Sequence, residues 1–140
     1  MVRDSAFPFQ ARKRHAIIRI MTANKKLIRP TMLWDGECGF CAHWIQRWEK
    51  TTGGTVEYRP YQEALSDFPQ VAEGDCKKAV QLVLTDGLVL AGAHAVLKSL
   101  AIGGRSKRLL SWYEHSRTFH WLADSAYRFV AANRSWLPKF

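Results

Sequence analysis

Two cysteines separated by two residues, placed between an apolar run and a helical pattern, constrain the fold of this chain more than any other feature. The apolar run covers residues 31–34 and breaks at Asp35 and Gly36, and the cysteines Cys38 and Cys41 follow this break. After Cys41 the apolar residues recur at the i+3, i+4 and i+7 positions that share one face of an α-helix. The sequence therefore predicts a buried strand, a turn, and a helix with both cysteines in its first turns.

The two thiols have different predicted environments. Cys38 is expected at the exposed start of the helix, where free N–H groups and the helix dipole favour a thiolate, whereas Cys41 is on the sheltered apolar face. This pattern is typical of a redox dithiol in which Cys38 attacks a disulfide and Cys41 resolves the mixed disulfide. Nearby carboxylates of Asp35 and Glu37 oppose a further negative charge. Asp35 either accepts backbone N–H bonds in the turn or takes the proton from Cys41 during resolution.

The order of the predicted elements indicates an α/β, thioredoxin-like fold. They are a strand at 31–34, a helix at about 38–52, a strand at 55–59, a short helix or turn region at 61–71, strands at 79–84 and 88–91, a helix from 93 to the glycines at 103 and 104, and an aromatic-rich helical segment within 105–140. The first strand, helix and strand form a βαβ unit, and the Asp86-Gly87 pair between the next two strands predicts a hairpin. The length predicts a single domain at 31–140, preceded by a basic N-terminal extension at 1–30.

The C-terminal segment carries a long apolar stripe at helical spacing, from Phe119 to Ala131. We expect this helix to form part of the domain core, with Tyr127 near the middle of its buried face. Trp121 and Phe129 fall off the stripe. Packing against a neighbouring helix is favoured for them over a partner-binding or membrane-surface face.

The net charge of +9 is concentrated at the two ends of the chain. Residues 1–30 hold eight Lys and Arg against one acid, residues 31–104 hold six against nine, and residues 105–140 hold seven against two. A specific nucleic-acid surface in the central part is therefore not expected. Three cysteines are too few for a secreted disulfide framework, and no run is apolar enough for membrane insertion. We expect a cytoplasmic protein in which residues 1–20 are dispensable for folding.

Several motifs together resemble the DCC family of predicted thiol-disulfide oxidoreductases, over roughly residues 31–140. They are Asp35-Gly36-x-Cys38-x-x-Cys41, Tyr58-Arg59-Pro60-Tyr61-Gln62, the Asp86-Gly87 hairpin and Val130-Ala131-Ala132-Asn133-Arg134-Ser135-Trp136. The resemblance implies a thioredoxin-like fold and disulfide exchange, with no cofactor. Ordinary thioredoxins place a cis-proline before the hairpin strand, but residues 75–79 of this chain contain no proline. Thioredoxin-like handling of peptide substrates is therefore in doubt.

Two other classes of function stay open. In the first, Cys38 and Cys41 form half of a zinc site that Cys76 completes with His43 or His94. In the second, the scaffold is a non-catalytic interaction module. Under the redox interpretation the expected partner is a disulfide-containing protein or a low-molecular-weight thiol, and His43 is a solvated helix residue. The sequence does not determine the oligomeric state.

Overall fold

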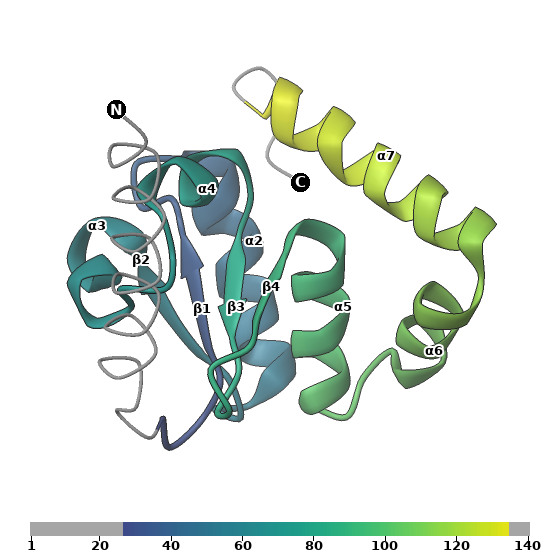
Figure 1. The fold of residues 1–140 in the computed structure, drawn as a ribbon, viewed down its shortest axis with the longest axis horizontal. Coiled ribbons are helices and arrows are strands. Elements are labelled where there is room, and N and C mark those ends of the chain that lie inside the picture. Colours follow the sequence, from purple (N-terminus) through teal and green to yellow (C-terminus); the bar gives the residue numbers. More distant parts are fainter. Residues whose placement is uncertain (1–26, 135–140) are drawn as a thin grey trace, which may run out of the picture.

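A computed structural model of the chain describes residues 27–134, so most of the predicted extension at 1–30 lies outside the described part (Figure 1). In chain order the described elements are β1 (Thr31–Trp34), α2 (Gly39–Thr52), β2 (Glu57–Pro60), α3 (Tyr61–Ala64), the 3-10 turn η1 (Leu65–Asp67), α4 (Glu73–Lys78), β3 (Gln81–Val83), β4 (Val89–Ala91), α5 (Gly92–Ile102), α6 (Lys107–His115) and α7 (Arg117–Asn133). The predicted strands, the cysteine-bearing helix and the hairpin are all present. The helix α4 was not predicted, because its six residues carry no clear apolar period.

The strands form one mixed sheet in the order β2-β1-β3-β4. β1 is parallel to β2, with Met32 opposite Tyr58, and antiparallel to β3, with Met32 opposite Leu82. β3 and β4 form the predicted hairpin, and Leu88 N–H donates to the Asp86 side chain at 2.9 Å in its turn. A parallel βαβ unit joined to an antiparallel hairpin and followed by a helix is the thioredoxin-like arrangement, so the predicted fold class is confirmed.

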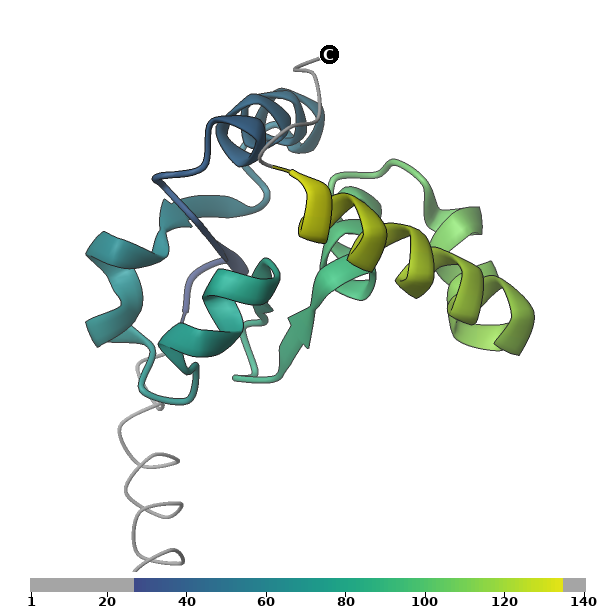
Figure 2. The same ribbon diagram turned by 90° about the horizontal axis from the view of Figure 1, so that it is seen from above.

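Each face of the sheet has its own apolar core, because neighbouring residues of a strand point to opposite sides. Met32 and Leu82 face α2 and α5, where they pack with Ile45 and Ala95. The other face is covered by α3, η1 and α4, and its core contains Leu33, Tyr61, Ala64, Phe68, Val71, Cys76 and Val83. Figure 2 shows helices on both sides of the strands. The two cores fix β1 tightly, and the start of α2 follows directly from it.

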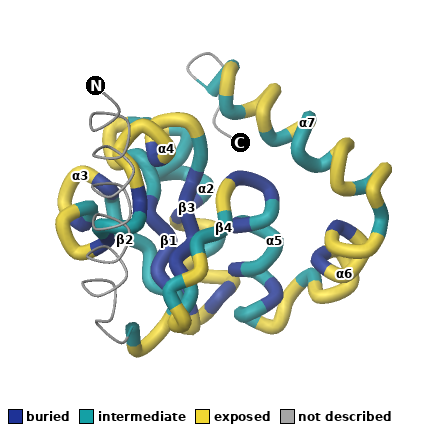
Figure 3. The backbone as a smooth tube through the Cα atoms, in the orientation of Figure 1, coloured by how far each residue is buried: buried dark blue, intermediate teal, exposed yellow. Residues whose placement is uncertain are grey.

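The last helix, α7, lies outside these two cores. It contacts α5 and α6 and runs past the β4 end of the sheet (Figures 1 and 2). None of its residues is buried (Figure 3). The expectation that α7 belongs to the core is therefore wrong, although Tyr127 does pack against the core on the α2 side. Trp121 and Phe129 are 66% and 62% exposed, so the helix–helix packing predicted for them is also wrong.

Candidate functional site

Cys38 is the N-cap residue of α2, immediately before the first helical turn. Its backbone is extended, and the backbone N–H of Cys41 donates to the Cys38 sulfur at 3.2 Å. A sulfur in this position receives one of the N–H groups that have no partner within the helix. It also lies at the positive end of the helix dipole. The sequence placed Cys38 in the first turn, and the structure places it one position earlier, as the cap.

Cys41 is one turn further along α2, on the face that also carries Trp44, Ile45 and Trp48. The pKa of the Cys41 thiol is raised to about 12, chiefly by burial and also by the hydrogen bond and charge of Cys38. Asp35 acts in the same direction, while the positive charge of Arg134 lowers the pKa. Both cysteines are free thiols in this structure. The inner thiol is therefore held in its neutral form, on the apolar face of α2 that the sequence pattern predicts for it.

The turn between β1 and α2 is held by the Asp35 carboxylate. One carboxylate oxygen accepts the Glu37 backbone N–H at 3.0 Å and the Gln62 side-chain amide at 2.8 Å. The Gln62 carbonyl in turn accepts the Gly36 N–H at 3.0 Å. A side chain at Gly36 would bring its Cβ within 2.9 Å of Pro60, so only glycine fits this close approach. These contacts are those of the turn role considered for Asp35, and its possible role as a proton acceptor stays a prediction.

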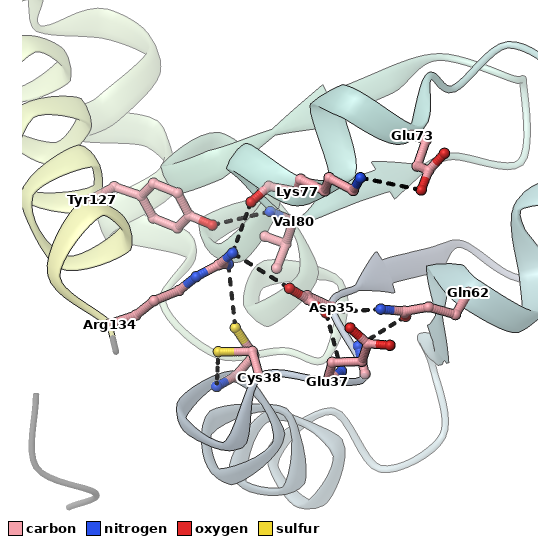
Figure 4. A network of polar contacts seen from close by, with 11 residues as sticks. Asp35, Glu37, Cys38, Gln62, Glu73, Lys77, Val80, Tyr127 and Arg134 are labelled. Atoms are coloured by element: carbon pink, nitrogen blue, oxygen red, sulfur yellow. Dashed lines mark hydrogen bonds and ion pairs between the residues drawn. The ribbon is translucent and has the colours of Figure 1, made fainter. Parts of the chain in front are cut away.

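Arg134, at the C-terminal end of α7, joins the site from the far end of the chain (Figure 4). Its guanidinium donates to the Cys41 sulfur at 3.6 Å, to the second Asp35 carboxylate oxygen at 3.4 Å and to the Lys77 carbonyl at 2.8 Å. The Arg134 and Asp35 side chains are only 25% and 15% exposed, so solvent screens this ion pair less than a surface pair. Arg134 thus places one positive charge between the inner thiol and the turn carboxylate.

Tyr127 makes a second link from α7 to the same region. The backbone N–H of Val80, just before β3, donates to the Tyr127 hydroxyl at 3.1 Å (Figure 4). Its ring lies 3.4 Å from the position that a Cβ on Gly92 would occupy, where the backbone has a positive φ. Residues 27–134 contain no cis peptide bond, in agreement with the missing proline before β3. The segment before β3 is therefore contacted by α7 side chains.

The zinc alternative receives no support from the described part of the chain. No group of three or more His, Cys, Asp and Glu side chains that could hold a metal ion occurs within it. His94 instead pairs with Glu114 at 3.4 Å. His43 is half-buried with its Nε2 atom shielded from solvent, so the expectation that it is solvated is wrong. Cys76 is 1% exposed, and burial raises its pKa to about 11.

Three residues of the site were not assigned by sequence reasoning: Gln62, Tyr127 and Arg134. Gln62 and Arg134 both belong to motifs that carry the resemblance described above, but neither motif indicates on its own what the residue contacts. Arg134 is separated from Asp35 by 99 positions. The only signal in the sequence for Gln62 and Arg134 was that each is a polar residue within one of these motifs.

The sheet order and the cysteine pair at the start of the helix after β1 define a thioredoxin-like protein with a C-x-x-C site. Residues 32–139 match the model of the DCC1-like thiol-disulfide oxidoreductase family, and the chain belongs to this family. The resemblance seen in the sequence is thereby confirmed. No curated protein and no solved structure matches the chain. Membership of the family suggests oxidoreductase activity and names no substrate.

Within residues 27–134, no helix combines the length and the apolar character needed to cross a bilayer. The cytoplasmic location stays a prediction.

Proposed function

We propose that the protein exchanges a dithiol for a disulfide at Cys38 and Cys41, with Cys38 as the nucleophile and Cys41 as the resolving thiol. The observation that carries this proposal is the difference between the two sulfurs. The Cys38 sulfur accepts a helix N–H, whereas the Cys41 thiol has its pKa raised to about 12, chiefly by burial. A thiolate is the attacking species in disulfide exchange, so the helix cap supports attack by Cys38 first.

The reaction has two steps. The Cys38 thiolate attacks one sulfur of a substrate disulfide, whose S–S bond breaks, and a mixed disulfide forms while the other substrate sulfur leaves as a thiolate. Cys41 then loses its proton and attacks the Cys38 sulfur, which forms the Cys38–Cys41 disulfide and releases the second substrate thiol. The dithiol is oxidised, the substrate gains an electron pair, and a second dithiol or low-molecular-weight thiol must return the enzyme to its reduced form. The same steps in reverse oxidise a substrate dithiol.

Arg134 and Asp35 support the second step in this proposal. The thiolate that forms on Cys41 lies 3.6 Å from the Arg134 guanidinium, which stabilises the negative charge. Asp35 orients Arg134 through its second carboxylate oxygen and is near enough to influence the Cys41 thiol electrostatically. We assign Arg134 as a positioning and charge-stabilising residue and Asp35 as the residue that holds the turn or accepts the proton.

The test compares the two single cysteine variants with the unmodified protein. When a substrate disulfide is added, Cys41→Ser should accumulate a stable mixed disulfide on Cys38, because the resolving thiol is absent. Cys38→Ser should form a mixed disulfide on Cys41 much more slowly. In the reduced unmodified protein, a limiting alkylating reagent at mildly acidic pH should label Cys38 first. Adduct formation that is equally fast in both variants, or faster labelling of Cys41, would reject the assignment.

A glutathione redox titration of the Cys38–Cys41 pair completes the test. A reversible transition between dithiol and disulfide is expected, and its midpoint separates a reductant from an oxidant. A pair that never closes under any poise would favour the non-catalytic interaction module. Cys76→Ser is the matched control, because this third cysteine is buried and not part of the C-x-x-C pair.

A further inference from the structure

An elongated cavity of about 490 Å³ opens between α2, α5 and α7, beside Cys41. The α7 residues that line it run from Phe119 to Arg134, and the C-terminal half of this helix is attached to the site by Tyr127 and Arg134 (Figure 4). Its walls include Trp44 and Trp48 of α2, Val96 and Leu97 of α5, and Phe119 and Ala126 of α7. A cavity of this size matches the volume that small-molecule ligands occupy.

The polar groups of this cavity are gathered at one end. Among the described residues that line it, Asp35 and Arg134 are the only charged ones, and they contact each other next to the Cys41 sulfur. The hydroxyl of Tyr127 already accepts the Val80 N–H. The rest of the wall is apolar, so a ligand that fits must present an apolar body to the groove and a polar or sulfur-containing group to the cysteine end.

The backbone near the site is poorly suited to an extended peptide. A peptide that adds to a protein as a strand needs free backbone N–H and C=O groups. In the segment before β3, the Val80 N–H is used by Tyr127 and the Lys77 carbonyl by Arg134. A peptide substrate could therefore not pair with these two backbone groups. Apolar contact in the groove is the remaining way to recognise a substrate.

We propose that this groove binds the apolar body of a low-molecular-weight disulfide and holds its S–S bond at the end that Cys41 lines, one helical turn from Cys38. This inference names the substrate class and rests on the proposed function. The groove positions the apolar group between α2 and α7, and the cysteine pair then carries out the exchange already described. Polar disulfides of similar reactivity lack the apolar contact and bind more weakly.

The first test measures specificity with two small disulfides, diphenyl disulfide as the apolar probe and bis(2-hydroxyethyl) disulfide as the polar one. The rate at which the protein reduces each disulfide is divided by the rate at which a free thiol of similar pKa reduces the same disulfide. The intrinsic reactivity of each disulfide then cancels. The full chain should prefer the apolar probe by about tenfold or more in kcat/KM, the scale on which apolar pockets discriminate. Ala126→Trp fills the groove from α7 and should bring this preference close to one. Thr118→Trp is the matched control, because Thr118 is exposed on the same helix and does not line the groove.

The second test measures binding without chemistry. Diphenyl sulfide has the shape of the apolar probe and no S–S bond, and its binding to the reduced protein can be followed by quenching of tryptophan fluorescence or by calorimetry. The unmodified protein and Thr118→Trp should bind it, whereas Ala126→Trp should bind at least about tenfold more weakly. Circular dichroism and urea unfolding confirm that each variant is folded. If Ala126→Trp does not fold, the smaller substitution Ala126→Leu gives the same comparison.

The outcomes separate this inference from the proposed function. Disulfide reduction with no apolar preference and no diphenyl sulfide binding would overturn the groove assignment and leave the proposed function standing. Binding that Ala126→Trp abolishes, without reduction of any disulfide, would uphold the groove as an apolar ligand site and reject the proposed function. A stable dimer in sedimentation velocity that fails to bind diphenyl sulfide would show that a second copy covers the groove, and the inference would be wrong.

Discussion

Replacing Arg134 by Gln tests how the C-terminal helix acts on the cysteine pair. The variant keeps a side chain of similar length and removes the positive charge 3.6 Å from the Cys41 sulfur. It also removes the partner of the Asp35 carboxylate. The Cys41 thiolate then loses its nearest cation, so its pKa should rise from a value that burial has already raised to about 12. The step that should suffer is resolution, in which Cys41 must lose its proton.

The magnitude follows from the contact. A bare charge pair at this distance and an effective dielectric constant of 20 is worth about 5 kcal/mol. Asp35 shares the same guanidinium, so the net effect should be nearer that of one hydrogen bond to a charged group, about 1.5 to 3 kcal/mol. This corresponds to a pKa rise of roughly 1 to 2 units. The thiolate fraction falls about 10- to 100-fold, but a thiolate of higher pKa is more nucleophilic, so resolution should slow by only roughly 3- to 13-fold.

Two assays measure these quantities separately. The pKa is read from thiolate absorbance in Cys38→Ser and in Cys38→Ser with Arg134→Gln, where Cys41 titrates without its neighbour. The resolution rate is read by stopped-flow release of the second substrate thiol from the Cys38 mixed disulfide. Arg128→Gln is the control, because Arg128 is an exposed cation on the same helix. An unchanged Cys41 pKa together with an unchanged resolution rate would refute the role of Arg134. A slower rate with an unchanged pKa would show that Arg134 acts only by holding α7 in place.

Three further predictions concern stability. The pKa of Cys41 in the folded protein is raised from 9.0 to about 12, so the neutral thiol stabilises the fold fully below pH 9.0, and this stabilisation is lost as pH rises toward 12. Urea unfolding across this pH range should show the loss. Cys41→Ser should make the free energy of unfolding less dependent on pH. Tyr127→Ala removes a packed ring and leaves the Val80 N–H without its partner, so it should lower the free energy of unfolding by about 2 to 3 kcal/mol. Tyr127→Phe removes only the hydroxyl and should lower it by about 1 kcal/mol. Equal losses in the two variants would contradict the packing argument. Gly36→Ala should cost about 1 to 3 kcal/mol, since its Cβ would lie 2.9 Å from Pro60, and an unchanged urea midpoint would show that the turn adjusts freely.

Local patterns were sufficient to predict most of the sheet and the first half of the site. The strand before Asp35, the helix after it and the Asp86-Gly87 hairpin all depend on residues close in sequence, where apolar period and turn chemistry are informative. The placement of Cys38 at the start of the helix and of Cys41 on its apolar face follows from the same helical period. These features could be predicted because the residues that determine them lie within one or two turns of each other.

The position of α7 could not be predicted in this way. Its apolar stripe indicates a helix with one covered face. The spacing of apolar residues does not show how closely the rest of the protein approaches that face. In the structure, Phe119 and Ala126 of that stripe line an open groove. Trp121 is 66% exposed, although α7 contacts both α5 and α6. The contact of Arg134 with Asp35 depends on the position of α7, so it was equally hidden from the sequence.

The way α7 is held connects the fold to the proposed chemistry. Arg134 and Tyr127 fix the C-terminal end of α7 to the turn, to the inner thiol and to the segment before β3. None of its residues is buried, and these polar contacts add to its packing against α5 and α6. The Arg134 contact changes strength when Cys41 ionises or enters a disulfide, since a disulfide sulfur carries no charge for the guanidinium to stabilise. Arg134 thus contacts the inner thiol and belongs to the segment that forms one wall of the groove.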